Sequence, residues 1–154
     1  MEQFQLTDEL IKKIADLILA KKNSNLKKLV NDIHFADMAD IINLLNEEQG
    51  VYLIKLFDSE KTSEILTELD ENVREKILKT LSVKEIAGEI EELDSDDAAD
   101  ILAELSEERK EEVISEISDN NLADNLIELL SYKEDSAGGL MAKELVKANE
   151  NWTV

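Results

Sequence analysis

The sequence predicts an all-α protein, a superhelix (α-solenoid) of about ten short helices with a short non-helical C-terminal tail. Three observations support this fold class. Apolar residues recur with the spacing of one helix face. A residue that can cap a helix N-terminus returns every twelve residues, and proline is absent, so capping must end one helix and begin the next. With 154 residues, the chain is long enough for one domain with a substantial core.

The first part of the chain predicts two helices that precede the regular repeat. Residues 6–22 form an amphipathic pattern that Thr7 can cap. We expect residues 23–25 (Asn-Ser-Asn) to break this helix and residues 26–33 to form a second, shorter one. His34 is the only histidine and falls on the capping position of the repeat. It has no partner at zinc-ligand spacing, so we interpret it as a capping or surface residue.

From His34 onward, the repeat dominates the chain. The residue before each capping position is apolar, and so is the residue three positions earlier. Each unit therefore predicts a cap followed by a three-turn helix with almost no loop. The seven predicted caps are Asn46, Asp58, Asp70, Ser82, Asp94, Ser106 and Ser118.

Helices of this length are unstable alone and must bury their apolar stripes against neighbours. A fixed short period predicts a stack in which each unit mainly contacts the next. The repeating unit is either one helix of twelve residues or a pair of helices every twenty-four. Gly50 and Gly88 fall inside predicted helices, and we expect a neighbouring helix to approach closely there.

The repeat ends near residue 130, and a different kind of sequence follows. Gly138 and Gly139 permit an unusual backbone turn. We predict a helical domain over residues 1–131. We interpret residues 132–154 as a linker and the truncated start of a further domain.

Composition restricts the possible functions. The formal net charge is −20, and the excess of acids lies almost wholly after residue 33. Such a surface repels nucleic acid, and it would be stabilised by cations or by a basic partner. The absence of cysteine excludes disulfides and thiolate zinc sites. We find no signal peptide and no apolar run of membrane-spanning length, so we expect no membrane insertion by this chain.

The best candidate site is the acidic segment that begins at Asp94. Asp96 and Asp100 are four residues apart and so share one helix face, where like charges destabilise the helix unless something neutralises them. Asp96 and Asp97 also suit the positive end of the helix dipole, whereas Asp100 lies in the second turn and has no such explanation. The spacing thus makes Asp96, Asp100 and Asp97 candidate metal ligands, with a solvated acidic face that serves solubility as the alternative. Magnesium fits, because it keeps several waters and takes one or two carboxylates.

Other sites have weaker support. Asp37 and Asp40 form a similar pair, for which we favour a solvated helix face. No nucleophile with a neighbouring base, phosphate-binding glycine loop or catalytic metal set is recognisable, so we expect no enzyme.

The short capped helices, the Asp-Asp-Ala-Ala-Asp segment at 96–100 and the Tyr-Lys-Glu-Asp-Ser-Ala-Gly-Gly-Leu-Met segment at 132–141 together resemble one family. This family is the N-terminal cytoplasmic domain of MgtE-type magnesium transporters. The resemblance extends from about residue 33 to the end of the chain. In that family, the segment matching 132–141 joins the helical domain to a pair of CBS domains.

The resemblance implies a magnesium sensor at the cytoplasmic face of the membrane. Mg²⁺ would bind between this domain and the CBS domains of the same polypeptide and gate the pore, and the full-length protein would be a homodimer. Asp96 and Asp100 match two aspartates that bind magnesium in the family. The site would be weak or incomplete in this chain alone. The alternative is a helical scaffold for protein interaction, such as a flagellar-motor-switch-like or adaptor solenoid, with no metal role.

Overall fold

The computed structural model describes residues 5–133 and 136–144. This part of the chain contains ten α-helices and no strand, which confirms the predicted all-α class. The helices are α1 (Asp8–Leu19), α2 (Asn23–Val30), α3 (Phe35–Leu44), α4 (Glu47–Ile54), α5 (Ser59–Glu68), α6 (Glu71–Thr80), α7 (Val83–Ile90), α8 (Ser95–Ala103), α9 (Glu107–Glu116) and α10 (Asn120–Leu130).

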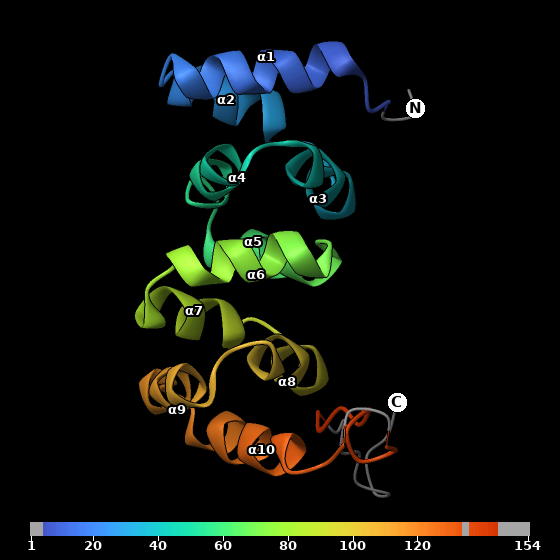
Figure 1. The fold of residues 1–154 in the computed structure, drawn as a ribbon, viewed down its shortest axis with the longest axis vertical. Helices are drawn as coiled ribbons and strands as arrows, with labels where there is room; N and C mark the ends of the chain where they lie inside the picture. The colour runs from blue at the N-terminus through green and yellow to red at the C-terminus, as the bar shows by residue number, and fades with distance from the viewer. Residues whose placement is uncertain (1–4, 134–135, 145–154) are drawn as a thin grey trace, which may run out of the picture.

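The helices stack along one long axis, with α1 and α2 at one end and α10 at the other (Figure 1). The closest packing joins alternate helices: α3 with α5, α5 with α7, α7 with α9, α4 with α6, and α8 with α10. Of the two alternatives that the period left open, the pair of helices every twenty-four residues therefore describes the packing. With the pair as the unit, these contacts join each unit to the next, as a solenoid requires.

The buried side chains are those of the predicted stripe. Leucine and isoleucine dominate the core, and pairs such as Ile41 with Ile42, Leu53 with Ile54, Ile65 with Leu66, Ile77 with Leu78, and Ile101 with Leu102 are all at most 2% exposed. Each pair comes from a different unit, so the stripes of successive units join into one continuous core.

The caps follow the predicted period with one shift. Asn46, Asp58, Ser82 and Ser106 accept the N–H of the third helical residue, as an N-cap should. Ser118 was predicted to cap the last helix, but the cap is Asp119, whose carboxylate accepts the N–H groups of Asn121 and Leu122. Ser118 instead donates its N–H to Glu91, at the end of α7.

Two further N-cap residues lie at the predicted positions but make no side-chain cap. Asp70 precedes α6 and Asp94 precedes α8, and neither carboxylate accepts a first-turn N–H. The N–H of Asp70 donates to Asn43 Oδ1 at 3.1 Å. At α8 the missing acceptor comes from the C-terminal tail, which is described below.

The break between the first two helices lies earlier than predicted. Lys21 has φ 52°, the left-handed conformation that ends α1. The N–H of Lys22 donates to the carbonyl of Leu17, and that of Lys21 donates to the carbonyl of Ile18, which is the Schellman pattern of helix ends. Residues 23–25 do not separate the two helices but form the first turn of α2.

Space around the glycines differs from site to site. A Cβ on Gly50 would lie 3.3 Å from Ile42 Cγ2, so the predicted close approach is present, whereas a Cβ on Gly88 would meet only Ser59 Oγ at 3.9 Å. Neither Gly138 nor Gly139 has a positive φ, so the predicted unusual turn is absent. Gly138 is required for another reason, because a Cβ there would lie 2.6 Å from the ring of Tyr132.

Arg74 connects three helices of the stack through hydrogen bonds. Arg74 on α6 donates from Nη1 to the carbonyls of Leu66 and Leu69 at the end of α5. Its Nε donates to both carboxylate oxygens of Glu104, at 2.9 and 3.1 Å. Because Glu104 follows α8, this half-buried pair fixes the end of α8 against α5 and α6.

Residues 136–144 turn back onto α8 and α10 without forming a helix, as predicted for the tail. Most of the predicted start of a further domain, residues 145–154, lies outside the described part of the chain.

Candidate functional site

Helix α8 has one buried face, which is largely apolar, and one acidic face. Its buried residues are Ser95, Ala98, Ala99, Ile101 and Leu102. The predicted ligands lie on the remaining surface, with Asp96 half-buried and Asp97 and Asp100 exposed. The same twelve-residue pattern that buries the stripe therefore places all three carboxylates on the outside of the stack.

The three carboxylates act on one another. The pKa of Asp97 is raised, first by partial desolvation and then by the negative charges of Asp96, Asp100, Asp94 and Glu68. Every one of these causes disfavours the ionised form, and no basic side chain offsets them. Among the described residues, neither Asp96 nor Asp97 forms an ion pair. The structure thus brings the predicted residues into one electrostatic cluster.

Glu68, the last residue of α5, joins this cluster and was not predicted as a site residue. It precedes Asp97 by almost thirty residues, and only the folding of the stack brings it near. The repeat does contain a weak signal, because glutamate also lies two residues before the capping position at Glu92, Glu104 and Glu116.

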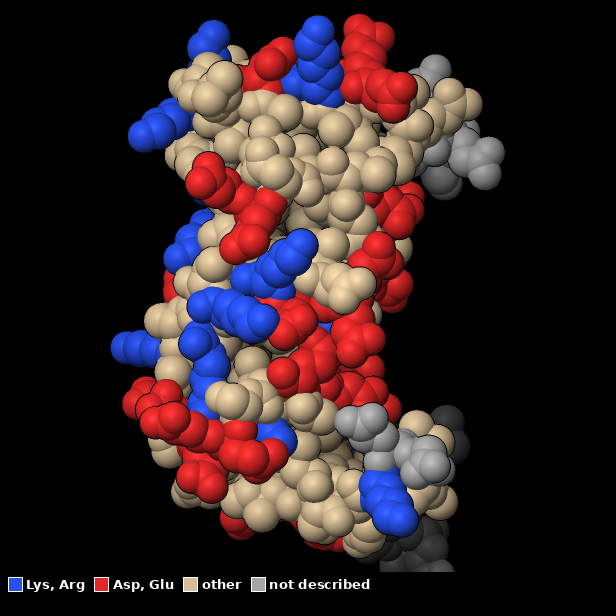
Figure 2. Space-filling view, viewed as in Figure 1, with Lys and Arg blue, Asp and Glu red and all other residues tan. Residues whose placement is uncertain are grey.

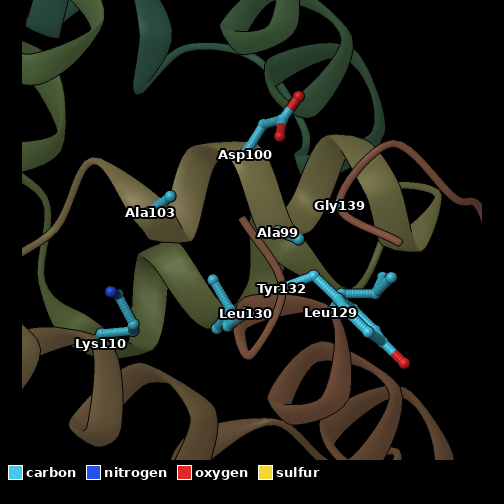
Figure 3. Close-up of a pocket in the computed structure, with 8 residues that line it drawn as sticks. All are labelled: Ala99, Asp100, Ala103, Lys110, Leu129, Leu130, Tyr132 and Gly139. Carbon is cyan, nitrogen blue, oxygen red and sulfur yellow. The ribbon is translucent and has the colours of Figure 1, made fainter. Parts of the chain in front are cut away.

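The cluster does not form a complete metal site. Within the described residues, no group of three or more histidine, aspartate or glutamate side chains is placed to hold a metal ion. Asp100 lies at the rim of a cavity of about 170 Å³ between α8, α9, α10 and the tail. Its carboxylate points away from Lys110, Leu130 and Tyr132, which line the other side of that cavity (Figure 3). Asp100 therefore faces away from the cavity interior.

Charge is unevenly spread over the surface. On the face shown in Figure 2, acidic side chains gather along one edge of the middle of the stack, and many of the lysines and arginines lie toward the opposite edge. An edge of this kind attracts cations from solution.

A second acidic cluster lies on α7 and was not predicted. Glu89 is half-buried, and among the described residues its Oε2 atom has no hydrogen-bond partner. Burial, followed by the charges of Glu92, Glu85 and Asp58, raises the pKa of Glu89 to about 7. Glu89 is thus surrounded by its own set of acids, and Glu91, which follows α7, accepts the N–H of Ser118.

The remaining candidates from the sequence are His34, which caps a helix, and Asp37 and Asp40, which lie on the surface of α3. His34 is the N-cap of α3, where its Nδ1 accepts the N–H of Ala36 at 3.3 Å, as predicted. Asp37 is half-buried and Asp40 is exposed on α3. Of the helices described, none is both long enough and apolar enough to cross a membrane.

Comparison with known proteins identifies the relatives of this architecture. The family model for the MgtE intracellular N domain matches residues 33–135. The soluble part of a magnesium transporter is similar with a TM-score of 0.76 and 19% identity, over 90% of this chain and 55% of that one. That likeness shows the fold.

The cytosolic domain of the Mg²⁺ channel MgtE, solved in complex with ATP, is similar with a TM-score of 0.74 and 25% identity, over 86% of this chain and 54% of that one. This chain therefore spans about half the length of the solved structures it matches. No curated protein sequence matches it significantly.

Proposed function

The chain belongs to the family of MgtE intracellular N domains, and from this membership we propose that it is the magnesium-sensing regulatory domain of a magnesium transporter. In the proposed protein, residues 1–131 form the sensor and residues 132–154 lead into CBS domains of the same polypeptide. The domain would lie on the cytosolic side of the membrane, in a homodimer, and would gate the pore without catalysing a reaction.

The observation that carries this proposal is the concentration of negative charge around Asp97. Four carboxylates, contributed by α5, α8 and the residue before α8, raise its pKa. A divalent cation would remove this repulsion. Magnesium suits the arrangement because it retains waters and needs only one or two carboxylates from any one surface.

The incomplete donor set supports a site shared between domains. We propose that Asp96 and Asp100, with Asp97, supply carboxylates from this domain and that the CBS domains supply the rest. Bound ions would then hold the two parts together. Loss of the ions would restore repulsion between acidic surfaces and release them, which converts magnesium concentration into a change of domain arrangement.

Thermal unfolding in MgCl₂ and in NaCl of equal ionic strength tests this proposal. We expect MgCl₂ to raise the Tm further than NaCl. For a Kd of about 1 mM, 10 mM Mg²⁺ would add about 1.4 kcal/mol, or roughly 3–5 °C. Equal shifts in the two salts would favour the scaffold function instead.

Paired substitutions locate the ion. Asp96→Asn with Asp100→Asn should remove the additional shift, because it removes two of the proposed donors. Asp37→Asn with Asp40→Asn is the matched control, since it removes the same charge from α3. Loss of the shift in the α3 variant alone would place the ion there and contradict the assignment to α8.

A further inference from the structure

A carboxylate from the C-terminal tail occupies the start of α8. The N–H of Ser95 donates to Glu144 Oε1 at 2.9 Å, and Ser95 Oγ donates to Glu144 Oε2 at 3.0 Å. In the other direction, the N–H of Lys143 donates to Ser95 Oγ at 2.9 Å. The serine hydroxyl thus uses both its donor and its acceptor capacity on the tail.

Glu144 supplies the interaction that Asp94 does not make. Asp94 has the extended backbone of an N-cap, yet its carboxylate accepts no first-turn N–H. A carboxylate at this position is favoured by the free N–H groups and by the helix dipole. In α8, the carboxylate comes from Glu144, 49 positions after Ser95.

The burial of Ser95 shows that the tail is part of the packed structure. Ser95 is 0% exposed. The first helical residue of the other regular units is exposed or half-buried: Glu47, Ser59, Glu71, Val83 and Glu107. Because the repeat places this position at the surface, the burial of Ser95 requires additional cover, and the tail residues bonded to it lie directly on this position.

The tail has a second anchor and a defined shape. Lys143 forms an ion pair with Glu128 on α10, and its side chain is only 17% exposed. Within the tail, the N–H of Leu140 donates to the carbonyl of Ser136 at 3.1 Å. Gly138 packs on the ring of Tyr132 so closely that no side chain would fit between them. The segment is thus held on both α8 and α10.

We propose that residues 136–144 are a strap that fixes the path by which the chain leaves the helical stack, with Ser95 and Glu144 as its clasp. The clasp closes on the first turn of α8, immediately before Asp96 and Asp97. Any movement of that turn therefore acts on the strap, and any pull on the strap acts on that turn. Ser95 and Glu144 are positioning residues. The inference does not rest on magnesium binding, and failure of the magnesium test would leave it standing.

Amide hydrogen exchange of the whole chain tests the clasp. The informative group is the Leu140 N–H, because its acceptor lies within the strap and neither Ser95 nor Glu144 bonds to it. If the clasp holds the strap as a unit, Ser95→Ala and Glu144→Ala should each speed exchange at Leu140. We expect roughly ten-fold or more, since each variant removes a hydrogen bond to a charged group.

Two variants separate loss of the clasp from general effects on α8. Asp94→Asn is the matched control, because the Asp94 carboxylate caps nothing and its neutralisation should leave exchange at Leu140 unchanged. Glu144→Ala leaves the core of α8 intact, so a fast strap in that variant would not reflect unfolding of the helix. Unprotected exchange at Leu140 in the unmodified protein, or equal protection in all variants, would overturn the proposal.

Discussion

Replacing Glu89 by glutamine should stabilise the protein at pH 8 and have little effect near pH 5. Burial and the charges of Glu92, Glu85 and Asp58 raise the pKa of Glu89 from 4.5 to about 7. Of these neighbours, Glu85 is paired with Lys55 at 3.2 Å, so its charge is partly offset. The folded protein therefore binds the Glu89 proton more tightly than the unfolded chain does, and stability falls as the pH rises from 4.5 through 7.

The size of this effect follows from the change in pKa. One pH unit corresponds to about 1.4 kcal/mol, so a rise from 4.5 to about 7 sets an upper limit of about 3.4 kcal/mol. Glu89 is only half-buried, and solvent screens its neighbours, so we expect roughly 1–2 kcal/mol. For a chain of this length, that is a rise in Tm of about 3–6 °C.

Thermal unfolding of the unmodified protein and of Glu89→Gln at pH 5 and pH 8 measures this difference. Glu116→Gln, an exposed glutamate on α9, is the matched control and corrects for the general gain from reducing the net charge. The physical reasoning would be refuted if Glu89→Gln changed the Tm equally at both pH values, or if it destabilised the protein at pH 8.

Two further predictions concern the stack itself. Arg74→Ala should cost about 2–3 kcal/mol in urea unfolding, because it leaves Glu104 and the end of α5 without their donor; a double-mutant cycle with Glu104→Ala that gave additive losses would contradict the pairing. Gly88→Ala should stabilise by roughly 0.5–1 kcal/mol, since a Cβ there has room. Gly50→Ala should gain less, because Ile42 must move, and an equal gain at both sites would show that the space around Gly50 is not limiting.

The acidic cluster was predicted from the sequence only in part. Asp96, Asp97 and Asp100 were identified because helical spacing alone places them on one face. Glu68 was not identified, because it reaches this cluster from α5. The separate set of acids around Glu89 was not predicted either, because burial in the stack and the approach of Asp58 depend on tertiary packing. The metal-ligand role of Asp96, Asp97 and Asp100 stays a prediction, since its remaining donors are not among the described residues.

The helix caps were likewise predicted from the sequence only in part. The period located the start of α8 at Asp94 correctly, but it could not reveal that Glu144 would supply the hydrogen bonds there. At the last helix, Ser118 and Asp119 are both good caps by residue type. The choice between them depends on Glu91, which accepts the N–H of Ser118 from the end of α7.

What the sequence alone determined was the set of local structures: the succession of short helices, most of their capping positions and the stripe that each one buries. These follow from interactions within a few residues, where spacing and residue type are sufficient. The tertiary structure alone decided that alternate helices pack together, that Glu68 joins the acids of α8, and that the tail returns to Ser95. Each of these joins parts of the chain that are distant in the sequence, and such contacts depend on the accumulated geometry of the stack.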